Sequence, residues 1–248
     1  MFGKKNGKVE SLLYSADRVK ILAMVREMGH MASEAFLLAV QSLEERNDAL
    51  ADRVIDDDDN IDDLEATIDH ECLCSIAMRQ PVREDLRFVF AVLKIITDLE
   101  RIGDQGVNIA KKAKILNQYP LVKPLVDIPK MKVIATEMVA DALRAFEENN
   151  TVLAEDICMR DDELDALYDR IFDELIGILS KKPEGDRATA QSAAGLLWVA
   201  RHLARIGDHA TNVAERVYFM VKGERLKPLL EAKKKALLAR SEENGFPH

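Results

Sequence analysis

The sequence predicts an all-α fold of two tandem three-helix bundles, and three observations support this prediction. First, residues 98–110 read DLERIGDQGVNIA and residues 202–214 read HLARIGDHATNVA, with seven of thirteen positions identical, which indicates an internal duplication. Second, only 7 prolines and 11 glycines interrupt long stretches rich in residues that favour helix, such as alanine, leucine, glutamate and lysine. Third, no segment shows the alternating apolar pattern and hairpin turn that are typical of β-sheet proteins.

The repeat continues upstream of this segment. Leu50-Ala51-Asp52 aligns with Leu153-Ala154-Glu155 at an offset of 103 residues, whereas the first segment repeats at an offset of 104. The difference indicates one inserted residue between the two matched stretches, and a loop is the natural place for it. Residues 79–81 (Arg-Gln-Pro) and 181–185 (Lys-Lys-Pro-Glu-Gly) supply helix breakers there.

Each half should hold three helices. We expect them at roughly 10–47, 49–79 and 83–118, and then at roughly 127–149, 151–181 and 187–223. The first bundle then covers residues 10–118 and the second covers 127–223, and each is large enough to bury a core. The linker around Pro120 and Pro124 is short, so we expect the bundles to pack together. Residues 224–248 form a polar C-terminal tail, for which we expect one weakly attached helix.

The charge balance restricts the partners and the compartment. Aspartate and glutamate total 44 against 35 lysines and arginines, giving a net charge of −9 without a dense basic stripe, so we expect no direct binding to nucleic acid. No apolar run approaches the roughly 18–20 residues of a membrane span. The basic start is followed by Glu10 and Asp17 rather than by the apolar segment of a signal peptide. The sequence therefore predicts a cytoplasmic protein.

The repeated segment has one apolar face and one face rich in oxygen-bearing side chains. On a helical wheel Glu100, Asp104 and Asn108 fall within about 80° of one another, with the apolar residues on the opposite half. Gly103 and Gly106 fall in the apolar half. Because glycine inside a helix costs roughly 1 kcal/mol relative to alanine, a close helix crossing is the expected reason for them.

The carboxylates of this face suggest a metal site. Two carboxylates at i and i+4 have Cβ atoms about 6 Å apart and repel each other, and a cation between them would reverse that repulsion. Oxygen ligands suit magnesium, calcium, manganese and iron. The preceding helix offers a second acidic row within about 60° of the wheel, made of Asp58, Asp62, Glu65 and Asp69. The second half keeps Asp161 and Asp165 at the first two of these positions, but has Tyr168 and Phe172 at the others.

Two other interpretations of these rows stay open. The carboxylates could be an ordinary solvated face, or Arg101 and Arg205 could neutralise them as ion pairs. A ferritin-like oxidase is not expected, because only Glu27–His30 has the Glu-x-x-His spacing that two helices would need. The chain also has no Walker-type phosphate loop and no nucleophile elbow, so we expect no enzyme activity. The alternative function is a carboxylate-bridged metal-storage or metal-dependent hydrolytic protein.

The segments Leu99–Asp104 (LERIGD) and Ala204–Glu215 (ARIGDHATNVAE) resemble the PhoU family of bacterial regulators of phosphate uptake. The resemblance covers roughly residues 15–223. Supporting positions are Ile61, Glu65, Ile68, Asp69, Cys72, Arg79-Gln80-Pro81 and Asp85-Leu86-Arg87.

The resemblance implies two bundles related by a pseudo-twofold axis, with multinuclear clusters of iron, zinc, manganese or magnesium. The implied ligands are Glu100 and Asp104 in the first half and Asp208 in the second, with Glu65 and Asp69 from the preceding helix. Ala204 stands where the family has an acid, so the second site would be weaker or would borrow Asp161 and Asp165.

The resemblance also implies a role and partners. Members of this family are negative regulators of the phosphate-starvation response. They are thought to connect the ATPase subunit of the phosphate ABC transporter to a membrane sensor histidine kinase. We therefore expect a homodimer that associates peripherally with these membrane complexes.

Overall fold

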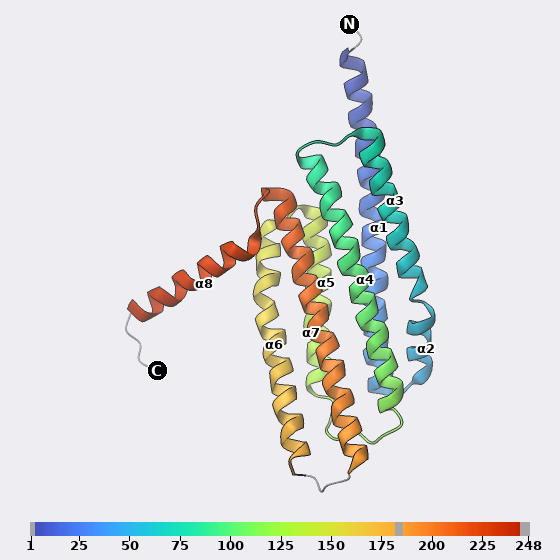
Figure 1. Cartoon of the computed structure of the whole chain (residues 1–248), viewed down its shortest axis with the longest axis vertical. Helices are drawn as coiled ribbons and strands as arrows, with labels where there is room; N and C mark the ends of the chain where they lie inside the picture. Colours follow the sequence, from blue (N-terminus) through green and yellow to red (C-terminus); the bar gives the residue numbers. More distant parts are fainter. Residues whose placement is uncertain (1–2, 182–185, 244–248) are drawn as a thin grey trace.

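The computed structural model describes residues 3–181 and 186–243 (Figure 1). Over these residues the chain forms helices and no strand, which confirms the all-α prediction. The first half contains α1 (Gly3–Glu45), α2 (Asp48–Asp56), α3 (Asp59–Arg79) and α4 (Glu84–Leu116). The second half contains α5 (Asp127–Glu148), α6 (Thr151–Leu179) and α7 (Arg187–Lys222), followed by α8 (Leu226–Glu243). The predicted breakers at 182–185 lie outside the described residues.

The prediction of one helix at 49–79 is wrong, because the chain breaks between α2 and α3 while its counterpart α6 is continuous. At the break, Asp57 has φ −85° and ψ −4°, and the Asn60 side chain donates a hydrogen bond to the Asp57 carbonyl. Asp56 to Asp59 are four consecutive carboxylates. Aspartate is a weak helix former that is stabilised at helix starts, so this run ends one helix and begins the next. The first helix also begins earlier than expected, at Gly3 rather than near residue 10.

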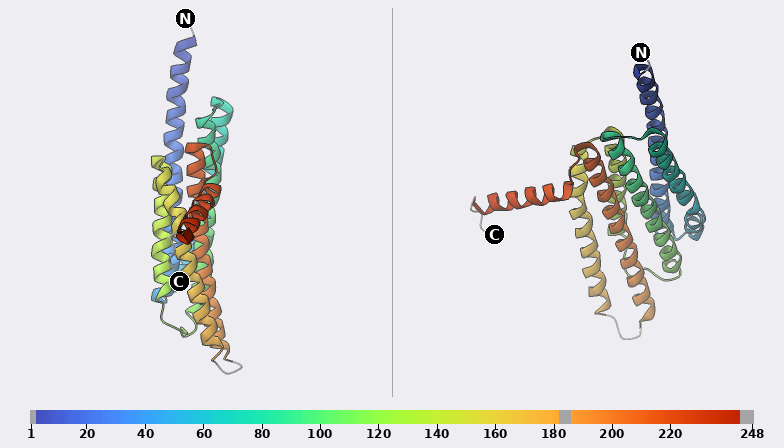
Figure 2. Two further views of the ribbon diagram at one scale, coloured as in Figure 1. Left: turned by 90° about the vertical axis from the view of Figure 1, so that its left-hand side faces the viewer. Right: turned by 45° about the horizontal axis from the view of Figure 1, so that its top comes forward.

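The helices form two layers. In Figure 1, α3, α4, α7 and α6 lie side by side, and the turned view in Figure 2 shows α1 and α5 behind them. The buried side chains form one cluster that includes Phe36 and Ile102 from the first half and Met138 and Val213 from the second. The two halves therefore share a core, with α4 against α7 and α1 against α5.

Glycines allow the close helix crossings that the repeat predicted. A β-carbon on Gly106 would lie 2.8 Å from the Phe36 backbone nitrogen, so α4 approaches the backbone of α1 as only glycine allows. Gly103 faces Ile61 in the first half as Gly207 faces Leu164 in the second. The same crossing therefore occurs once in each half.

The last helix projects away from the two layers (Figures 1 and 2). Gly223, with φ +74°, ends α7, and Leu226, the first residue of α8, is buried. Lys233 on α8 pairs with Glu155 on α6 at 2.5 Å. The predicted tail thus contains one helix, while residues 244–248 lie outside the described part of the chain. Over the described residues, no helix combines the length and apolar character that crossing a bilayer requires.

Candidate functional site

A first acidic cluster forms where α3 runs antiparallel to α4. Thr97 on α4 donates a hydrogen bond to Glu65 on α3 at 3.1 Å, and Ile61 packs at Gly103, which fixes the register of the two helices. This register brings together five carboxylates, which we call the first cluster: Asp58, Asp62, Glu65, Glu100 and Asp104.

These carboxylates lie close enough for their charges to act on one another. Burial, together with the charges of Asp104, Glu65 and Asp62 and against that of Arg101, raises the pKa of Glu100 from its ordinary value of 4.5 to about 7. Burial followed by the charges of Asp62 and Asp104 also raises the pKa of Asp58. A site that holds several mutually repelling carboxylates is well suited to a multivalent cation.

The structure does not bring every expected residue into this cluster. Asp69 lies one helical turn beyond Glu65, away from Glu100, and its charge acts on the thiol of Cys72. Asp62 and Asp58 take part instead. The sequence had placed all four acids on one face, but only the register between α3 and α4 decides which of them meet Glu100.

Arg101 occupies the space between the two carboxylates of the repeated motif. Its Nε lies 3.3 Å from Glu100 Oε2 and its Nη1 lies 3.0 Å from Asp104 Oδ2. In the described parts of the chain, no three Asp, Glu, His or Cys side chains are arranged to hold a metal ion together. Arg101 is 53% exposed, so it can turn outwards to make room for a cation. The donor set, which is all carboxylate oxygen, fits a hard cation.

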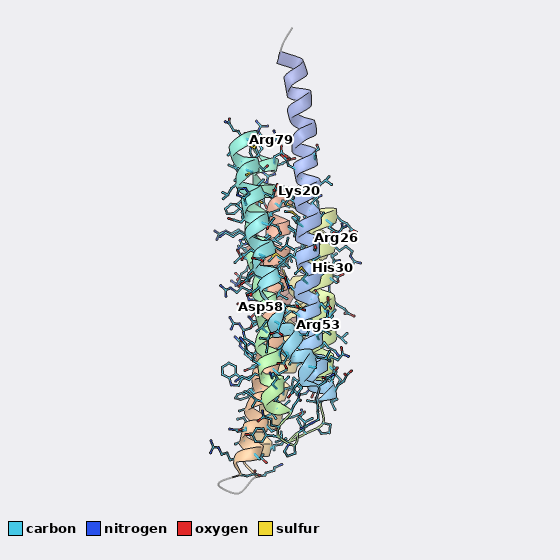
Figure 3. The ribbon with its side chains drawn as sticks, turned by 90° about the vertical axis from the view of Figure 1, so that its right-hand side faces the viewer. Lys20, Arg26, His30, Arg53, Asp58 and Arg79 are labelled. Carbon is cyan, nitrogen blue, oxygen red and sulfur yellow. The ribbon has the colours of Figure 1, made fainter. Side chains whose placement is uncertain are left out.

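A small pocket opens beside the first cluster at the break between α2 and α3. It has a volume of about 180 Å³ and is lined by Met31, Val54 and Ile61, with Arg53 and Asp58 among its polar residues. Figure 3 shows Asp58 at the break and Arg53 on α2. Arg53 pairs with Glu34 on α1 at 2.7 Å. The pocket gives solvent access to the Asp58 end of the cluster.

The second half has a smaller acidic cluster, which consists of Asp161 and Asp165 on α6 and Asp208 on α7. Burial and the charges of Asp208 and Asp169 raise the pKa of Asp165, and Arg201 opposes this. Asp161 Oδ1 lies 3.2 Å from the position that a β-carbon on Gly207 would take, so it faces α7. Ala204, the counterpart of Glu100, is only 2% exposed. The second cluster therefore lacks the partly buried carboxylate that Glu100 provides in the first.

Two polar pairs join α4 to α7, and sequence reasoning missed both. His209 Nδ1 and Asn212 Nδ2 each donate to Asp98 Oδ1 at 3.0 Å, and the ring nitrogen Nδ1 of His202 lies 2.9 Å from Gln105 Oε1. Asp98 and His202 occupy equivalent positions of the repeat, as do Gln105 and His209. In the sequence these residues appear only as two positions at which the repeats differ. The packing of α4 against α7 shows that the residues at these positions contact each other.

The His202 pair lies in a buried, positively charged environment. Burial, together with the positive charges of Arg205, Lys112 and Arg201, lowers the pKa of His202 from 6.5 to about 4. His202 is therefore a neutral hydrogen-bonding residue at physiological pH rather than a proton switch.

Comparison with known proteins identifies the family. Residues 25–113 and 128–217 each match the PhoU domain. The chain is 37% identical to a phosphate-specific transport system accessory protein PhoU homolog of Clostridium acetobutylicum, over 86% of this chain and 96% of the relative. A homolog of Aquifex aeolicus that bears the same name is 39% identical, over 82% of this chain and 90% of the relative.

Solved structures agree with the sequence comparison. The crystal structure of PhoU from Pseudomonas aeruginosa matches with a TM-score of 0.80 at 32% identity, covering 85% of this chain and all (100%) of that protein. A phosphate transport system regulatory protein PhoU from Streptococcus pneumoniae matches with a TM-score of 0.77 at 25% identity, covering 86% of this chain and 99% of that protein. Both halves, their order and their packing are shared, and the chain belongs to the PhoU family.

Proposed function

We propose that this protein is a negative regulator of phosphate uptake and of the phosphate-starvation response. It acts as a metal-binding adaptor between the ATPase subunit of a phosphate ABC transporter and a sensor histidine kinase. The observation that carries the proposal is the match of both halves to proteins named as accessory to phosphate-specific transport. The protein works in the cytoplasm, as a homodimer at the surface of membrane complexes, by binding and without catalytic turnover or contact with nucleic acid.

The acidic clusters supply the metal-binding part of the proposal. Glu100 and Asp104, with Asp58, Asp62 and Glu65, would hold a hard cation in the first half, and Asp161, Asp165 and Asp208 would hold one in the second. A bound cation would neutralise carboxylates that otherwise repel one another across α3 and α4, or across α6 and α7. It would therefore stiffen the exposed side of the layer on which partners can bind.

A gene deletion tests the regulatory role. In phosphate-rich medium the deletion strain should express phosphate-starvation genes that the parent keeps repressed, and the wild-type gene on a plasmid should restore repression. Unchanged expression in the deletion strain would contradict the proposal.

The adaptor role needs a separate test of partners. The tagged protein should co-purify with the transporter ATPase and the kinase from cells grown at high phosphate, and this association should change at low phosphate. The alternative of a storage or hydrolytic protein predicts many bound ions per chain or measurable turnover instead. Metal stoichiometry and phosphoester hydrolysis assays on the purified protein distinguish these functions.

A further inference from the structure

The second half contains an open pocket where α5 begins and α6 ends, which is the lower end of both helices in Figure 1. Its volume is about 710 Å³, within the range of roughly 300–1,000 Å³ that is usual for small-molecule sites. We call it the cationic pocket, because four cations and two carboxylates line it: Lys123, Lys130, Arg170, Lys181, Asp127 and Glu174. Asp169 and Asp173, the neighbouring acids of α6, are not among its described lining residues.

Four of these charged side chains form a clamp that is neutral as a whole. Asp127, the first residue of α5, is buried, and Lys123 Nζ lies 3.4 Å from its Oδ2. Arg170 on α6 donates a hydrogen bond to Asp127 Oδ1, and Lys123 also pairs with Glu174 on α6. Two cations and two carboxylates thus balance one another, and they join the linker to α5 and α6.

Lys130 and Lys181 are the cations that the clamp does not balance. Lys130 Nζ lies 3.4 Å from Asp127 Oδ1, the oxygen that Arg170 already contacts, and its side chain is 56% exposed. Lys181 lies just past the end of α6 and is exposed. The pocket therefore has two positive charges in excess, in a chain whose net charge is −9. A concave site lined by an excess of one charge attracts ligands of the opposite charge.

The first half repeats part of the clamp but not the excess of cations. At the offset of 103 residues, Lys20 and Glu71 correspond to Lys123 and Glu174, and they form the same ion pair at 2.7 Å. Met24 stands in place of Asp127. The other three cationic positions hold residues without positive charge in the first half, namely Glu27, Thr67 and Met78. The shared scaffold therefore does not require the excess, which belongs to the second half alone.

The remaining part of the cationic pocket is apolar. Pro124, Val126 and Ile178 line it, and Val126 is 53% exposed. Gly177 keeps the α6 side open, since a β-carbon there would meet nothing within 4 Å. An open apolar surface beside a group of cations suits an anion that carries a flat apolar ring.

We propose that the cationic pocket binds a nucleoside 5′-phosphate. A phosphate monoester carries nearly two negative charges at neutral pH, which matches the two cations in excess. Lys130 and Lys181 would contact the phosphate oxygens, together with guanidinium N–H groups of Arg170. The base would lie on the apolar side of the pocket, over Gly177. The inference depends neither on the proposed role in phosphate regulation nor on metal binding at the acidic clusters.

Two smaller kinds of ligand match the pocket less well. A monocarboxylate carries a single charge and would leave one cation in excess. Inorganic phosphate has a suitable charge, but it would leave the apolar side of the pocket uncovered. A nucleoside phosphate matches both the charge and the apolar surface.

Isothermal titration calorimetry on the full-length protein tests the proposal. The probes are AMP, GMP, CMP and UMP, and the comparison ligands are the corresponding nucleosides and inorganic phosphate. A chelator in the buffer prevents divalent ions from joining a nucleotide to the acidic clusters. At least one nucleotide should bind with saturation at one site per chain. Its nucleoside and inorganic phosphate should each bind at least tenfold more weakly.

Variants that carry the first-half residues locate the binding. Lys130→Glu/Lys181→Met should weaken nucleotide binding about tenfold or more. Lys94→Glu/Lys235→Met makes the same change of net charge at exposed positions outside the pocket, and it should bind like the wild type. Gly177→Leu should weaken binding without any change of charge, because the new side chain would fill the apolar side.

Circular dichroism and thermal unfolding show whether each variant is folded. If Lys130→Glu/Lys181→Met does not fold, Lys181→Met alone changes only an exposed residue, and it should weaken binding about threefold.

Several results would overturn the proposal. These are no saturable binding of any of the four nucleotides, equal binding of the nucleoside, or equal losses in Lys130→Glu/Lys181→Met and Lys94→Glu/Lys235→Met. Equal binding of inorganic phosphate, with no effect of Gly177→Leu, would assign the pocket to phosphate alone.

Discussion

At the scale of single residues, Glu100 shows how its neighbours determine its chemistry. It is partly buried and lies near Asp104, Glu65 and Asp62, and Arg101 opposes their effect. Its pKa is therefore raised to about 7, so its carboxyl group stays largely protonated below that pH. A cation would have to displace that proton as well as the Arg101 side chain. Metal affinity at this cluster should therefore fall as the pH drops below 7.

The raised pKa of Glu100 also predicts a pH-dependent stability of the metal-free protein. The folded pKa of about 7 lies above the ordinary value of 4.5, so this group stabilises the fold fully below pH 4.5, and the stabilisation is lost as the pH rises through 7. Glu100→Gln, which stays neutral, should therefore unfold at a higher temperature than the wild type at pH 8 and at a similar temperature at pH 4.5. Thermal unfolding in the presence of a chelator measures this.

The exposed Glu163 on α6 supplies the control. Glu163→Gln should change the unfolding temperature little at either pH. If the unfolding temperatures of Glu100→Gln and the wild type differ by the same amount at pH 4.5 and pH 8, the prediction is wrong. The effect of the substitution would then not depend on the ionisation of Glu100.

Glycine at a helix crossing gives a second residue-scale prediction. Gly106→Ala should destabilise the protein by about 1–3 kcal/mol, because the new methyl group would press on the α1 backbone at Phe36 and backbone cannot move aside as a side chain can. Gly177→Ala on α6 is the matched control, since a β-carbon there meets nothing within 4 Å. It should stabilise the protein by about 0.5–1 kcal/mol through helix propensity. Urea unfolding of both variants measures the two signs, and two changes of the same sign would contradict the packing argument.

At the scale of helices, the contact between α4 and α7 holds the two halves together. Its apolar contacts are supplemented by the pairs of Asp98 with His209 and Asn212, and of Gln105 with His202. These pairs are equivalent under the repeat, so the duplication explains both their positions and their common geometry. Polar pairs across a largely apolar contact specify the register of the two helices.

Removing one acceptor in this contact should be costly. Asp98→Ala would leave the donors on His209 and Asn212 without their shared acceptor, and the expected loss is about 1–3 kcal/mol of unfolding free energy. Asp63→Ala, at an exposed position of α3, is the control and should change stability by less than about 0.5 kcal/mol. Chemical denaturation compares the two, and a loss no larger than that of the control would mean that water replaces Asp98 without cost.

Some features of the helices could be predicted from the sequence and others could not. Helix existence followed from composition, and the crossing at Gly106 followed from a glycine on the apolar face. The break at Asp57 was missed because its counterpart in α6 is continuous, so the repeat suggested one helix. The choice of Asp62 over Asp69 as a neighbour of Glu100 depends on the offset between two helices, which periodicity within one helix cannot give. The Asp98–His209 pair joins the two halves. The repeat shows that the halves are alike, but it does not show which of their helices pack against each other.

At the scale of the whole molecule, two equivalent halves have acquired different outer surfaces. The first cluster consists of five carboxylates, and Glu100 and Asp104 are two of them. The second half has the buried Ala204 in place of Glu100, and Tyr168 and Phe172 in place of Glu65 and Asp69. The shared core and the crossing glycines keep the scaffold symmetric. The exposed sides of α3 and α6 are free to differ, because their side chains contribute little to the core.

This asymmetry predicts that the first half binds metal more tightly than the second. Each missing carboxylate removes both a ligand and a negative charge that balances the cation. At limiting Mn²⁺ or Fe²⁺, Glu100→Ala/Asp104→Ala should therefore lose most of the bound metal, whereas Asp208→Ala should retain most of it. Metal content after gel filtration measures both. If the double variant keeps its metal and Asp208→Ala loses it, the stronger site lies in the second half. If the wild type holds no metal, Arg101 is the counter-ion of Glu100 and Asp104, and the carboxylate rows are solvated surface.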